Sequence, residues 1–291
     1  MSSSTPVPVT LPSVSVVIAC RNAARELGTQ LAALTQQRYS GAWEVIISDN
    51  GSTDRTREVA QSYKSEIPQL RIVDSSNRPG PGHARNVAAR ASTADYLLFC
   101  DADDEVASDW IAAMMARLPE SGLVAGRFEA RKLNSTRAMR SRPLQQDVGL
   151  QTSPFGPALP HAGAGNMGIA TTMFLSAGGF DPTLRVLEDT DLCWRLQLTG
   201  AQMLFVPEAV VHVRLRHSLT DMWHQGDSYG RAAALLEHRY DLMLGPAKPS
   251  GRTSQNYGNT TAKLWKMLRS NPTPGALLWT IGWHWGYRRR S

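Results

Sequence analysis

Residues 96–104 read YLLFCDADD, an apolar run that leads directly into three aspartates. The same arrangement occurs earlier in the chain, where the run EVIIS at residues 44–48 precedes Asp49. Short apolar runs of this kind are typical of buried strands in a parallel sheet, and open α/β folds bind ligands where such strands end. The two stretches therefore predict acidic side chains at the carboxyl edge of a sheet.

A third acidic cluster, EDTD at residues 188–191, follows later in the chain. Carboxylates that converge on one sheet edge repel one another unless a cation neutralises them. Carboxylate oxygens beside substrate phosphates are the ligands that Mg²⁺ or Mn²⁺ takes in proteins. The Asp101-x-Asp103 pair therefore predicts Mn²⁺ or Mg²⁺ as a cofactor.

The order of apolar and polar stretches predicts an α/β fold. We expect strands at residues 14–19, 43–48, 70–74, 96–100, 123–128, 203–206 and 210–215, and helices at 25–37, from 54 onward, and at 83–91, 174–178 and 189–198. Strands that alternate with helices indicate a mostly parallel sheet flanked by helices. Residues 131–160 have little periodicity, so we expect a long mobile loop there.

Length and composition favour one large α/β domain with an appendage. The chain has 291 residues, of which 42% are hydrophobic, enough for a substantial core. Residues 1–12 lack the basic flank and apolar block of an export signal, so we expect a disordered lead and a cytoplasmic protein. Cys20, Cys100 and Cys193 show no Cys-x-x-Cys spacing, which predicts buried reduced thiols.

The net charge of +6 is concentrated in the C-terminal tail, where Asp241 is the only acidic residue between Arg239 and Ser291. An acidic sheet edge repels nucleic acid, so we expect no nucleic-acid partner. The basic tail instead predicts peripheral contact with an anionic membrane at its inner face.

Residues 276–287 are apolar and aromatic but shorter than the ~20 residues that span a bilayer. They suit the headgroup layer, beside the basic residues 288–290. The alternative is a helix that packs on the large α/β domain or on a second subunit. An amphipathic stretch at residues 219–244 is expected to join this tail to the domain.

The chain resembles the family-two inverting glycosyltransferases of the GT-A fold. The resemblance lies in the order and spacing of VSVVIACRN (14–22), DNGSTD (49–54), GHARN (82–86), DADD (101–104), GGFD (178–181) and EDTD (188–191). It implies a GT-A catalytic domain at residues 13–217, with a nucleotide-binding half at 13–118 and an acceptor half at 119–217. Residues 218–291 would form a helical, basic appendage.

The resemblance implies four contacts to a nucleotide-sugar donor. Ala19 and Arg21 would lie beside the base or ribose, and Asp49 would accept a hydrogen bond from the ring N–H of a pyrimidine. Arg85 would contact phosphate or hold an acidic loop, with a surface ion pair as the alternative. For Asp49 the alternative is a turn or cap residue.

The implied metal ligands are Asp103, in direct contact, and Asp101, on the ribose or on metal-bound water, with Asp104 in support. A helix cap is the alternative for this cluster. His212 would reach the metal or the diphosphate, although a lone histidine on an apolar strand is also an ordinary structural residue. Arg214, Arg216 and His217 would cover the diphosphate, or form a solvated strand edge.

Asp189 is the predicted catalytic base, because inverting transfer needs a carboxylate to take the proton of the attacking hydroxyl. Glu188 is the second choice and would hold the acceptor, and by analogy His161 and Asn166 would line the acceptor side. The dipole at a helix N-terminus keeps such carboxylates ionised, but acidic residues in a first turn are also ordinary stabilising features. Asp54 and Asp191 are expected to have such structural roles.

The expected function is transfer of a sugar from a nucleotide-sugar donor, most often a UDP-sugar in this family, to a hydroxyl of a glycan or lipid-linked acceptor. Such an enzyme would build a surface or secreted glycan. One alternative is a nucleotidyltransferase, although residues 19–25 lack the glycines of a triphosphate loop. The other is a catalytically inactive module that binds a nucleotide or a glycan.

Overall fold

The computed structural model describes residues 11–67, 69–141, 144–216, 218–245 and 273–289. Residues 1–10 of the predicted lead lie outside the described residues. The strands are β1 (Val14–Cys20), β2 (Trp43–Asp49), β3 (Arg71–Asp74), β4 (Tyr96–Asp101), β5 (Glu105–Val106), β6 (Leu123–Glu129), β7 (Asn166–Ala170) and β8 (Leu204–His212). The helices are α1 (Leu27–Thr35), α2 (Thr56–Ser62), α3 (Pro81–Ala91), α4 (Trp110–Met115), α5 (Leu118–Ser121), α6 (Thr136–Ser141), α7 (Thr171–Ser176), α8 (Glu188–Leu198), α9 (Leu219–Leu244) and α11 (Pro274–Arg288).

The strands form one sheet in the order β3-β2-β1-β4-β7-β6-β8-β5. Strands β1 to β4 are parallel, β7 is antiparallel to both of its neighbours, and β8 is parallel to β6. Because β7 reverses the direction twice, β6 and β8 run the same way as β1 to β4. The carboxyl ends of these six strands therefore meet at one edge of the sheet, which confirms the predicted α/β fold.

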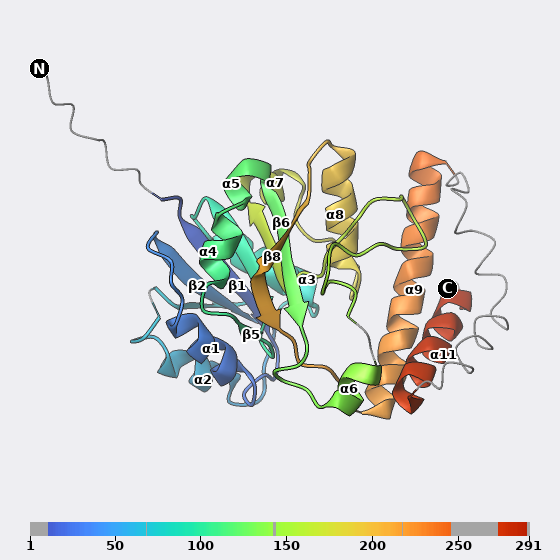
Figure 1. Ribbon diagram of the computed structural model, residues 1–291, viewed down its shortest axis with the longest axis horizontal. Coiled ribbons are helices and arrows are strands. Elements are labelled where there is room, and N and C mark those ends of the chain that lie inside the picture. Colours follow the sequence, from blue (N-terminus) through green and yellow to red (C-terminus); the bar gives the residue numbers. More distant parts are fainter. Residues whose placement is uncertain (1–10, 68, 142–143, 217, 246–272, 290–291) are drawn as a thin grey trace, which may run out of the picture.

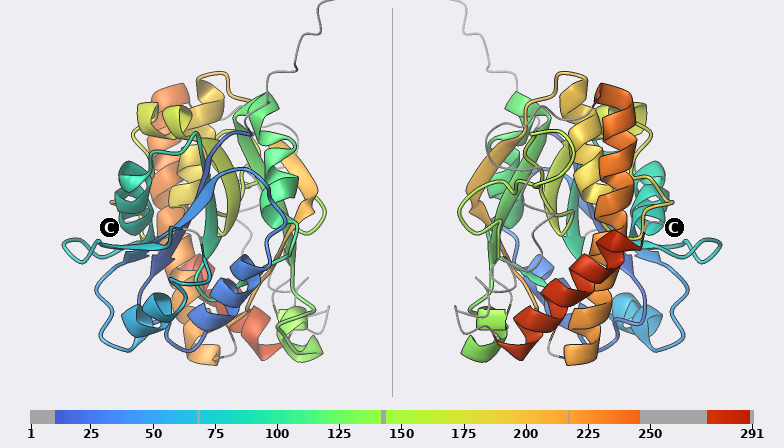
Figure 2. Two further views of the ribbon diagram at one scale, coloured as in Figure 1. Left: turned by 90° about the vertical axis from the view of Figure 1, so that its left-hand side faces the viewer. Right: turned by 90° about the vertical axis from the view of Figure 1, so that its right-hand side faces the viewer.

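Helices cover both faces of the sheet (Figures 1 and 2). Alternate side chains of β1 explain the two layers, because Val16 and Ile18 belong to one buried cluster and Val17 to the other. The first cluster includes Leu31 of α1, and the second includes Phe174 of α7. All of these side chains are essentially inaccessible to solvent.

Two sequence predictions need correction. The two expected strands at residues 203–206 and 210–215 form one strand, β8, whose register against β6 shifts between Gly126 and Arg127. A β-bulge of this kind accommodates extra residues without ending the strand. The expected mobile loop at residues 131–160 contains α6 and packs through Gln146 and Phe155, both of which are buried.

The C-terminal helices lie side by side beyond α8 (Figure 2). A third buried cluster joins α8 to α9 and contains Trp194 and Tyr240, with Trp283 of α11 at its margin. The α11 helix thus packs against α9. Because α9 belongs to the predicted appendage and not to the predicted catalytic domain, both alternatives for residues 276–287 stay predictions. None of the helices in the described ranges has the length and apolar character that crossing a bilayer requires. Strand β8 ends at His212 and α9 begins at Leu219, but the domain boundary at residue 217 stays a prediction.

Glycines allow α9 and α11 to meet backbone to backbone. A Cβ atom on Gly226 would lie 2.1 Å from the carbonyl oxygen of Trp279, and one on Gly230 would lie 2.0 Å from that of Trp283. Gly282 and Gly286 of α11 face α9 in the same way. The facing residue numbers increase together along both helices, so the two helices run parallel.

We predict that Gly230→Ala destabilises the protein. Alanine in a helix is intrinsically better than glycine by about 1 kcal/mol, but here its methyl group would force two backbones apart, at a cost of about 1–3 kcal/mol. The net loss should lower the melting temperature by about 2–4 °C per kcal/mol, measured by circular dichroism. Gly28→Ala in α1, where a Cβ would meet nothing closer than 3.8 Å, is the control. A melting temperature for Gly230→Ala at or above that of the wild type would refute the prediction.

All three cysteines are buried and unpaired, as the sequence predicted. Burial raises the pKa of the Cys193 thiol to about 12. Burial also raises the thiol pKa of Cys20 and Cys100, and the neighbouring carboxylates add to the effect, with Asp49 the largest contributor at Cys20 and Asp101 at Cys100.

Candidate active site

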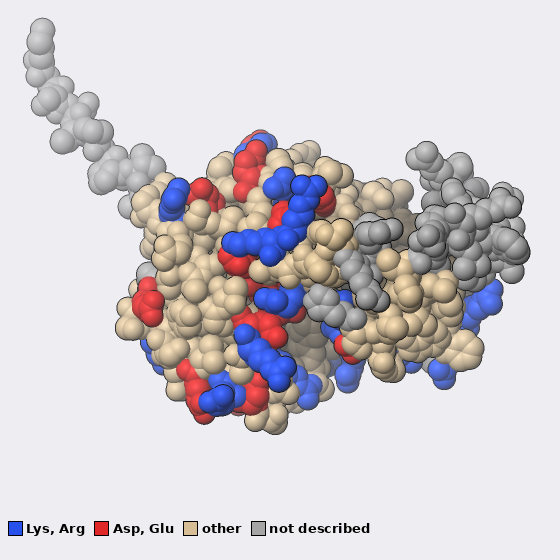
Figure 3. Space-filling model, turned by 60° about the horizontal axis from the view of Figure 1, so that its bottom comes forward, with Lys and Arg blue, Asp and Glu red and all other residues tan. Residues whose placement is uncertain are grey.

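Strand register brings the first two acidic clusters to one edge of the sheet. Strand β1 lies between β2 and β4, with Cys20 opposite Asp49 and Ala19 opposite Asp101. Both aspartates are therefore the last residues of strands that flank β1. Figure 3, which brings the bottom of Figure 1 forward, shows acidic and basic side chains around a hollow on that face.

Asp49 is buried and held by neighbours on the following turn and helix. Its Oδ1 accepts a hydrogen bond of 3.0 Å from the Ser52 amide, and its Oδ2 pairs with Arg57. Burial alone would raise the pKa of Asp49, but the hydrogen bonds from Ser52 and Arg57 hold it below its usual range. A ring N–H of a bound base would therefore have to share this carboxylate with Arg57.

Arg85 joins the second acidic cluster to the third. Its Nη2 donates to Asp101 at 2.6 Å and its Nη1 donates to Glu188 at 2.8 Å. The guanidinium comes from α3, and its side chain is only 7% exposed. Arg85 is therefore a buried bridge between Asp101 and Glu188 and not an exposed surface pair, while its contact with a phosphate stays a prediction.

A loop of small residues lies between Asp101 and Asp189. A Cβ on Gly165 would lie 2.7 Å from Oδ2 of Asp101, so any larger residue there would require the Asp101 carboxylate to shift. The adjacent Ala164 amide donates to Oδ2 of Asp189 at 3.0 Å. The small side chains thus let one stretch of backbone contact two carboxylates from distant parts of the chain.

Glu188 and Asp189 are neighbours in α8 but differ in environment. Glu188 is buried, and burial together with the charge of Asp189 raises its pKa to about 7, an effect that Arg85 partly offsets. Asp189 is half-buried and accepts backbone hydrogen bonds from Ala164 and from Thr190, the latter at 2.7 Å. Asp189 is therefore the more accessible carboxylate, and its orientation is fixed.

The residues after Asp101 divide into one exposed and one buried carboxylate. Asp103 is exposed, and its backbone oxygen accepts from the Arg214 guanidinium at 3.1 Å. Asp104 is buried and accepts from the Arg214 amide at 2.8 Å. Burial and the charges of Asp101 and Asp103 raise the pKa of Asp104 well above its usual range. Negative charge is thus crowded here, and a bound cation would relieve it.

The predicted metal ligands do not form a preassembled site. His212 bonds through Nδ1 to Glu129 at 2.7 Å, at the carboxyl ends of β8 and β6. Within the described ranges, no group of three or more His, Cys, Asp or Glu side chains could hold a metal ion. Glu129 engages Nδ1 of His212 and not its Nε2, and a carboxylate on one ring nitrogen is common in metal-binding histidines. Asp101, Asp103 and His212 as metal ligands therefore stay a prediction.

His161 and Asn166 have structural partners. Asn166 is fully buried, and it accepts from the Trp110 indole at 2.8 Å and donates to the carbonyls of Arg127 and Ala209, both at 2.9 Å. These bonds occupy its amide, so Asn166 does not line an acceptor site.

His161 is also buried. Its Nε2 lies 2.8 Å from the Ser153 hydroxyl and its Nδ1 lies 3.2 Å from the Thr190 hydroxyl. This ring therefore supports the start of α8 and is not open to an acceptor, which corrects the predicted role.

Other predicted residues fall as follows. Arg21 is exposed just after β1, and its role stays a prediction. Asp54 accepts from the amide of Thr56, the first residue of α2, at 3.0 Å, but Arg55 occupies the cap position and no side chain caps the helix there. His217 lies outside the described residues.

Arg57 pairs with Asp49 but is not among the predicted site residues. Its place in the first turn of the helix that follows Asp49 could have predicted this contact. Sequence analysis also missed Gln30, whose buried amide joins the Asp101 carbonyl, at 3.2 Å, to the Val106 amide, at 2.9 Å. Nothing in the sequence around Gln30 marks that contact.

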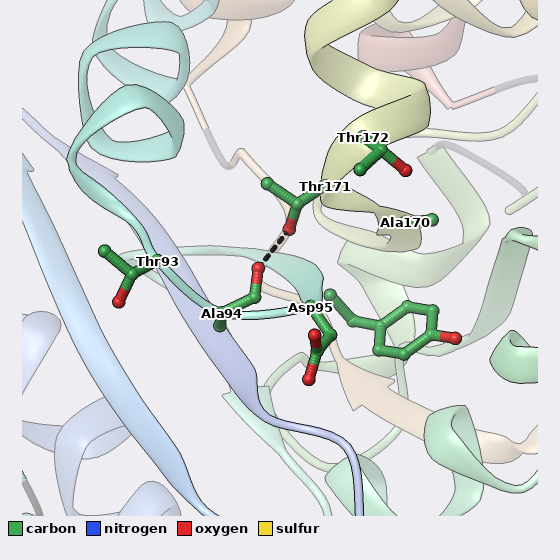
Figure 4. A pocket seen from close by; sticks show the side chains of 7 residues that line it. Thr93, Ala94, Asp95, Ala170, Thr171 and Thr172 are labelled. Atoms are coloured by element: carbon green, nitrogen blue, oxygen red, sulfur yellow. Dashed lines mark hydrogen bonds between the residues drawn. The ribbon is translucent and has the colours of Figure 1, made fainter.

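A separate surface pocket lies at the opposite edge of the sheet (Figure 4). It is lined by Thr93, Ala94, Asp95, Tyr96, Ala170, Thr171 and Thr172. Tyr96 is the first residue of β4 and Asp101 is the last, so this pocket is not part of the acidic site.

The buried His161 predicts a pH dependence of stability. Burial lowers its pKa to about 4, although the charge of Asp189 acts in the opposite direction. The unfolded chain takes up this proton near pH 6.5, so stability falls as the pH drops from 6.5 to 4, by up to about 3 kcal/mol. Urea unfolding across this range should show a shallower loss for His161→Gln than for the wild type. His224→Gln, at an exposed position of α9, should follow the wild type, and equal slopes for His161→Gln and wild type would contradict the prediction.

Comparison with known proteins identifies the family. The model of Glycosyl transferase family 2 matches residues 15–175, more than half of the chain. The chain belongs to this family, as its motifs indicated.

Among individual relatives, a pre-mycofactocin glycosyltransferase of Mycobacterium tuberculosis is 29% identical over 245 residues. That match covers 82% of this chain but only half of the relative. The succinoglycan biosynthesis protein ExoA of Rhizobium meliloti is 26% identical, with 79% and 72% of the two chains covered.

Solved structures show the same GT-A fold. The mannosyltransferase PcManGT from Pyrobaculum calidifontis, in complex with GDP-Man and Mn²⁺, superposes with a TM-score of 0.65 at 17% identity, covering 98% of this chain and 89% of that one. Residues 1–349 of TarS from S. aureus, solved with UDP-GlcNAc, give a TM-score of 0.56 at 16% identity, with 95% and 89% covered.

Proposed function

We propose that this chain is a metal-dependent inverting glycosyltransferase that uses a nucleotide-sugar donor, with a UDP-sugar as the first candidate. The observation that carries the proposal is the convergence of Asp101 and Asp189 on the loop at Ala164 and Gly165, with Arg85 bridging Asp101 to Glu188. Family membership supports sugar transfer, and the nucleotide-sugar complexes of PcManGT and TarS support the class of donor.

The donor would lie over the carboxyl ends of β1, β2 and β4. Ala19, Arg21 and Asp49 would face the nucleoside, and Asp101 and Asp103 would face the diphosphate. A divalent ion suits the crowded carboxylates, with Asp103 as the exposed ligand and diphosphate oxygens completing its shell. When bound, the metal offsets the charge that develops on the nucleoside diphosphate as it leaves.

Asp189 would act as the base. Backbone amides of Ala164 and Thr190 fix its carboxylate, so it can accept the proton of an acceptor hydroxyl that attacks the anomeric carbon from the side opposite the diphosphate. The Glu188 carboxylate forms an ion pair with Arg85. Its role is therefore to hold Arg85 beside Asp101 and not to take the proton.

We predict that Asp189→Asn and Asp103→Asn both abolish transfer but for different reasons. Loss of the base should lower kcat by about 10²–10⁴-fold and leave donor binding unchanged. Loss of the metal ligand should remove the Mn²⁺-dependent part of donor binding. Calorimetry with UDP and Mn²⁺, together with a transfer assay over a panel of nucleotide sugars, separates the two effects.

The control for these variants is Asp109→Asn, since Asp109 forms only an exposed pair with Arg38 at 3.8 Å. The reaction product also tests the function itself. Release of a nucleoside diphosphate from a nucleotide sugar supports sugar transfer. Release of pyrophosphate from a nucleoside triphosphate, supplied with a sugar phosphate in a separate assay, would indicate nucleotidyl transfer. No release in either assay would indicate a binding module. Full activity of Asp189→Asn would contradict the role given to Asp189.

The acceptor is proposed to be a glycan or a lipid-linked sugar, reached by peripheral contact of α11 with an anionic membrane at its cytoplasmic face. Trp285 is 53% exposed, and the Arg289 guanidinium lies 5.6 Å from the centre of its ring. Helix α11 carries no acidic residue. An exposed tryptophan beside arginines suits the headgroup layer.

We predict that the wild type binds vesicles of phosphatidylglycerol more tightly than vesicles of phosphatidylcholine, and that salt weakens the binding. Arg289→Gln should weaken it about fivefold, since each basic residue contributes about 1 kcal/mol, and Trp285→Ala should weaken it on both lipids. Leu175→Ala, at another exposed apolar residue on α7, is the control. Equal sedimentation of the wild type with both lipids would refute the membrane contact.

A further inference from the structure

The start of helix α8, which carries Glu188 and Asp189, has no local cap. The preceding residue, Leu187, has φ 62° and ψ 15°, and no side chain caps the helix. A non-glycine residue in this left-handed region costs about 1–2 kcal/mol. Tertiary contacts must therefore hold the first turn of α8 where it is.

Asp191 supplies such contacts. It is fully buried in the first turn of α8, and its Oδ2 accepts from Arg195 at 2.7 Å. Its Oδ1 accepts from Arg239 at 3.1 Å and from the Tyr240 hydroxyl at 3.2 Å, and both of these residues lie on α9. The sequence analysis had expected only an ordinary first-turn acid here.

Helix geometry separates Asp191 from Asp189. Each residue of a helix is rotated by about 100° from the one before it, so the side chains of residues two apart point to nearly opposite sides of the helix. Asp189 contacts the Ala164 amide on one side of α8, and Asp191 contacts α9 on the other. The buried carboxylate is therefore an anchor for the helix and not a second base.

Arg239 of α9 and Arg195 of α8 also hold the turn before α8. Arg239 pairs with Asp181 at 2.9 Å, and Arg195 donates to the carbonyls of Ala177 and Gly179, both at 2.7 Å. The next residue, Phe180, bonds through its backbone to the side-chain amide of Asn86 on α3, whose Nδ2 donates to the Phe180 carbonyl and whose Oδ1 accepts from the Phe180 amide. Helix α3 also carries Arg85, which donates to Glu188 at the start of α8. The contacts therefore run from α8 through α9, the turn and α3, and back to α8.

Tyr240 is set rigidly for this role. Its side chain is 1% exposed, and its ring meets the Trp194 ring edge-on at a centroid distance of 5.1 Å. Its hydroxyl is the part of the side chain that bonds to Asp191. Removing that one oxygen would leave the packing intact while weakening the anchor.

We propose that Arg239 and Tyr240 are positioning residues that place the Asp189 carboxylate for proton transfer by holding Asp191. The inference rests on the proposed function and extends it to the C-terminal helices, because α9 is itself held by α11 through the facing glycines. Misplacement of a catalytic group by about 1 Å can cost about 100-fold in rate.

The first test is Tyr240→Phe, which keeps the ring and removes the hydroxyl. The expected result is a fall in kcat of about tenfold or more, with the dissociation constant for UDP and Mn²⁺ unchanged. Tyr39→Phe, which loses a hydroxyl bond to the Pro12 carbonyl, is the control and should keep the wild-type kcat. If Tyr240 had only a structural role, Tyr240→Phe would lower the stability of the protein, and kcat would not fall while donor binding stayed unchanged.

A second pair of variants tests the arginine. Arg239→Met should lower kcat further and Arg239→Lys should recover part of the loss, since lysine keeps the charge. Arg231→Met, on the same helix but paired with Asp227, should leave kcat unchanged. Hydrogen exchange at the amides of residues 188–192 should be faster in Tyr240→Phe and Arg239→Met than in the wild type.

The outcomes are distinct. An active wild type whose kcat survives both Tyr240→Phe and Arg239→Met overturns the inference and leaves the proposed function standing. Unchanged exchange at residues 188–192 overturns it as well. A wild type that transfers no sugar from any donor in the panel overturns the proposed function, and this inference with it.

Discussion

The buried ion bridge of Arg85 is the interaction on which the site depends. A guanidinium withdrawn from water is tolerated only if opposite charges meet it, and here Asp101 and Glu188 do so from two different elements. The bridge fixes the distance between the end of β4 and the start of α8. The loop at Ala164 and Gly165 lies between them, close to Asp101 and bonded to Asp189.

The sequence predicted correctly those strands and helices that are determined by a short stretch of neighbouring residues. An apolar run followed by an aspartate marks the end of a buried strand, and the register of β1 then sets Asp49 and Asp101 two strands apart. The Pro-Gly turn before α3 marks the helix that carries Arg85. The motif order also indicated the family and fold, while the choice of Asp189 as the base stays a prediction.

What sequence reasoning missed depends on partners distant in the chain. Asn166 looked like a ligand residue, but its partners are an indole and two backbone carbonyls that no pattern reveals. Asp191 looked like a helix-end acid, yet its partner Arg239 lies 48 residues later. Polar side chains have few local signatures once they are buried, because long-range packing decides which groups meet.

The three cysteines have a practical consequence. Thiol reagents and peroxides attack the thiolate, which burial and nearby carboxylates disfavour at Cys20, Cys100 and Cys193. The protein should therefore tolerate air without added reductant. A pair of cysteines introduced on the surface, one on α8 and one on α9, would then take up fluorescent or spin labels selectively, so the distance between these helices becomes measurable without first removing the native thiols.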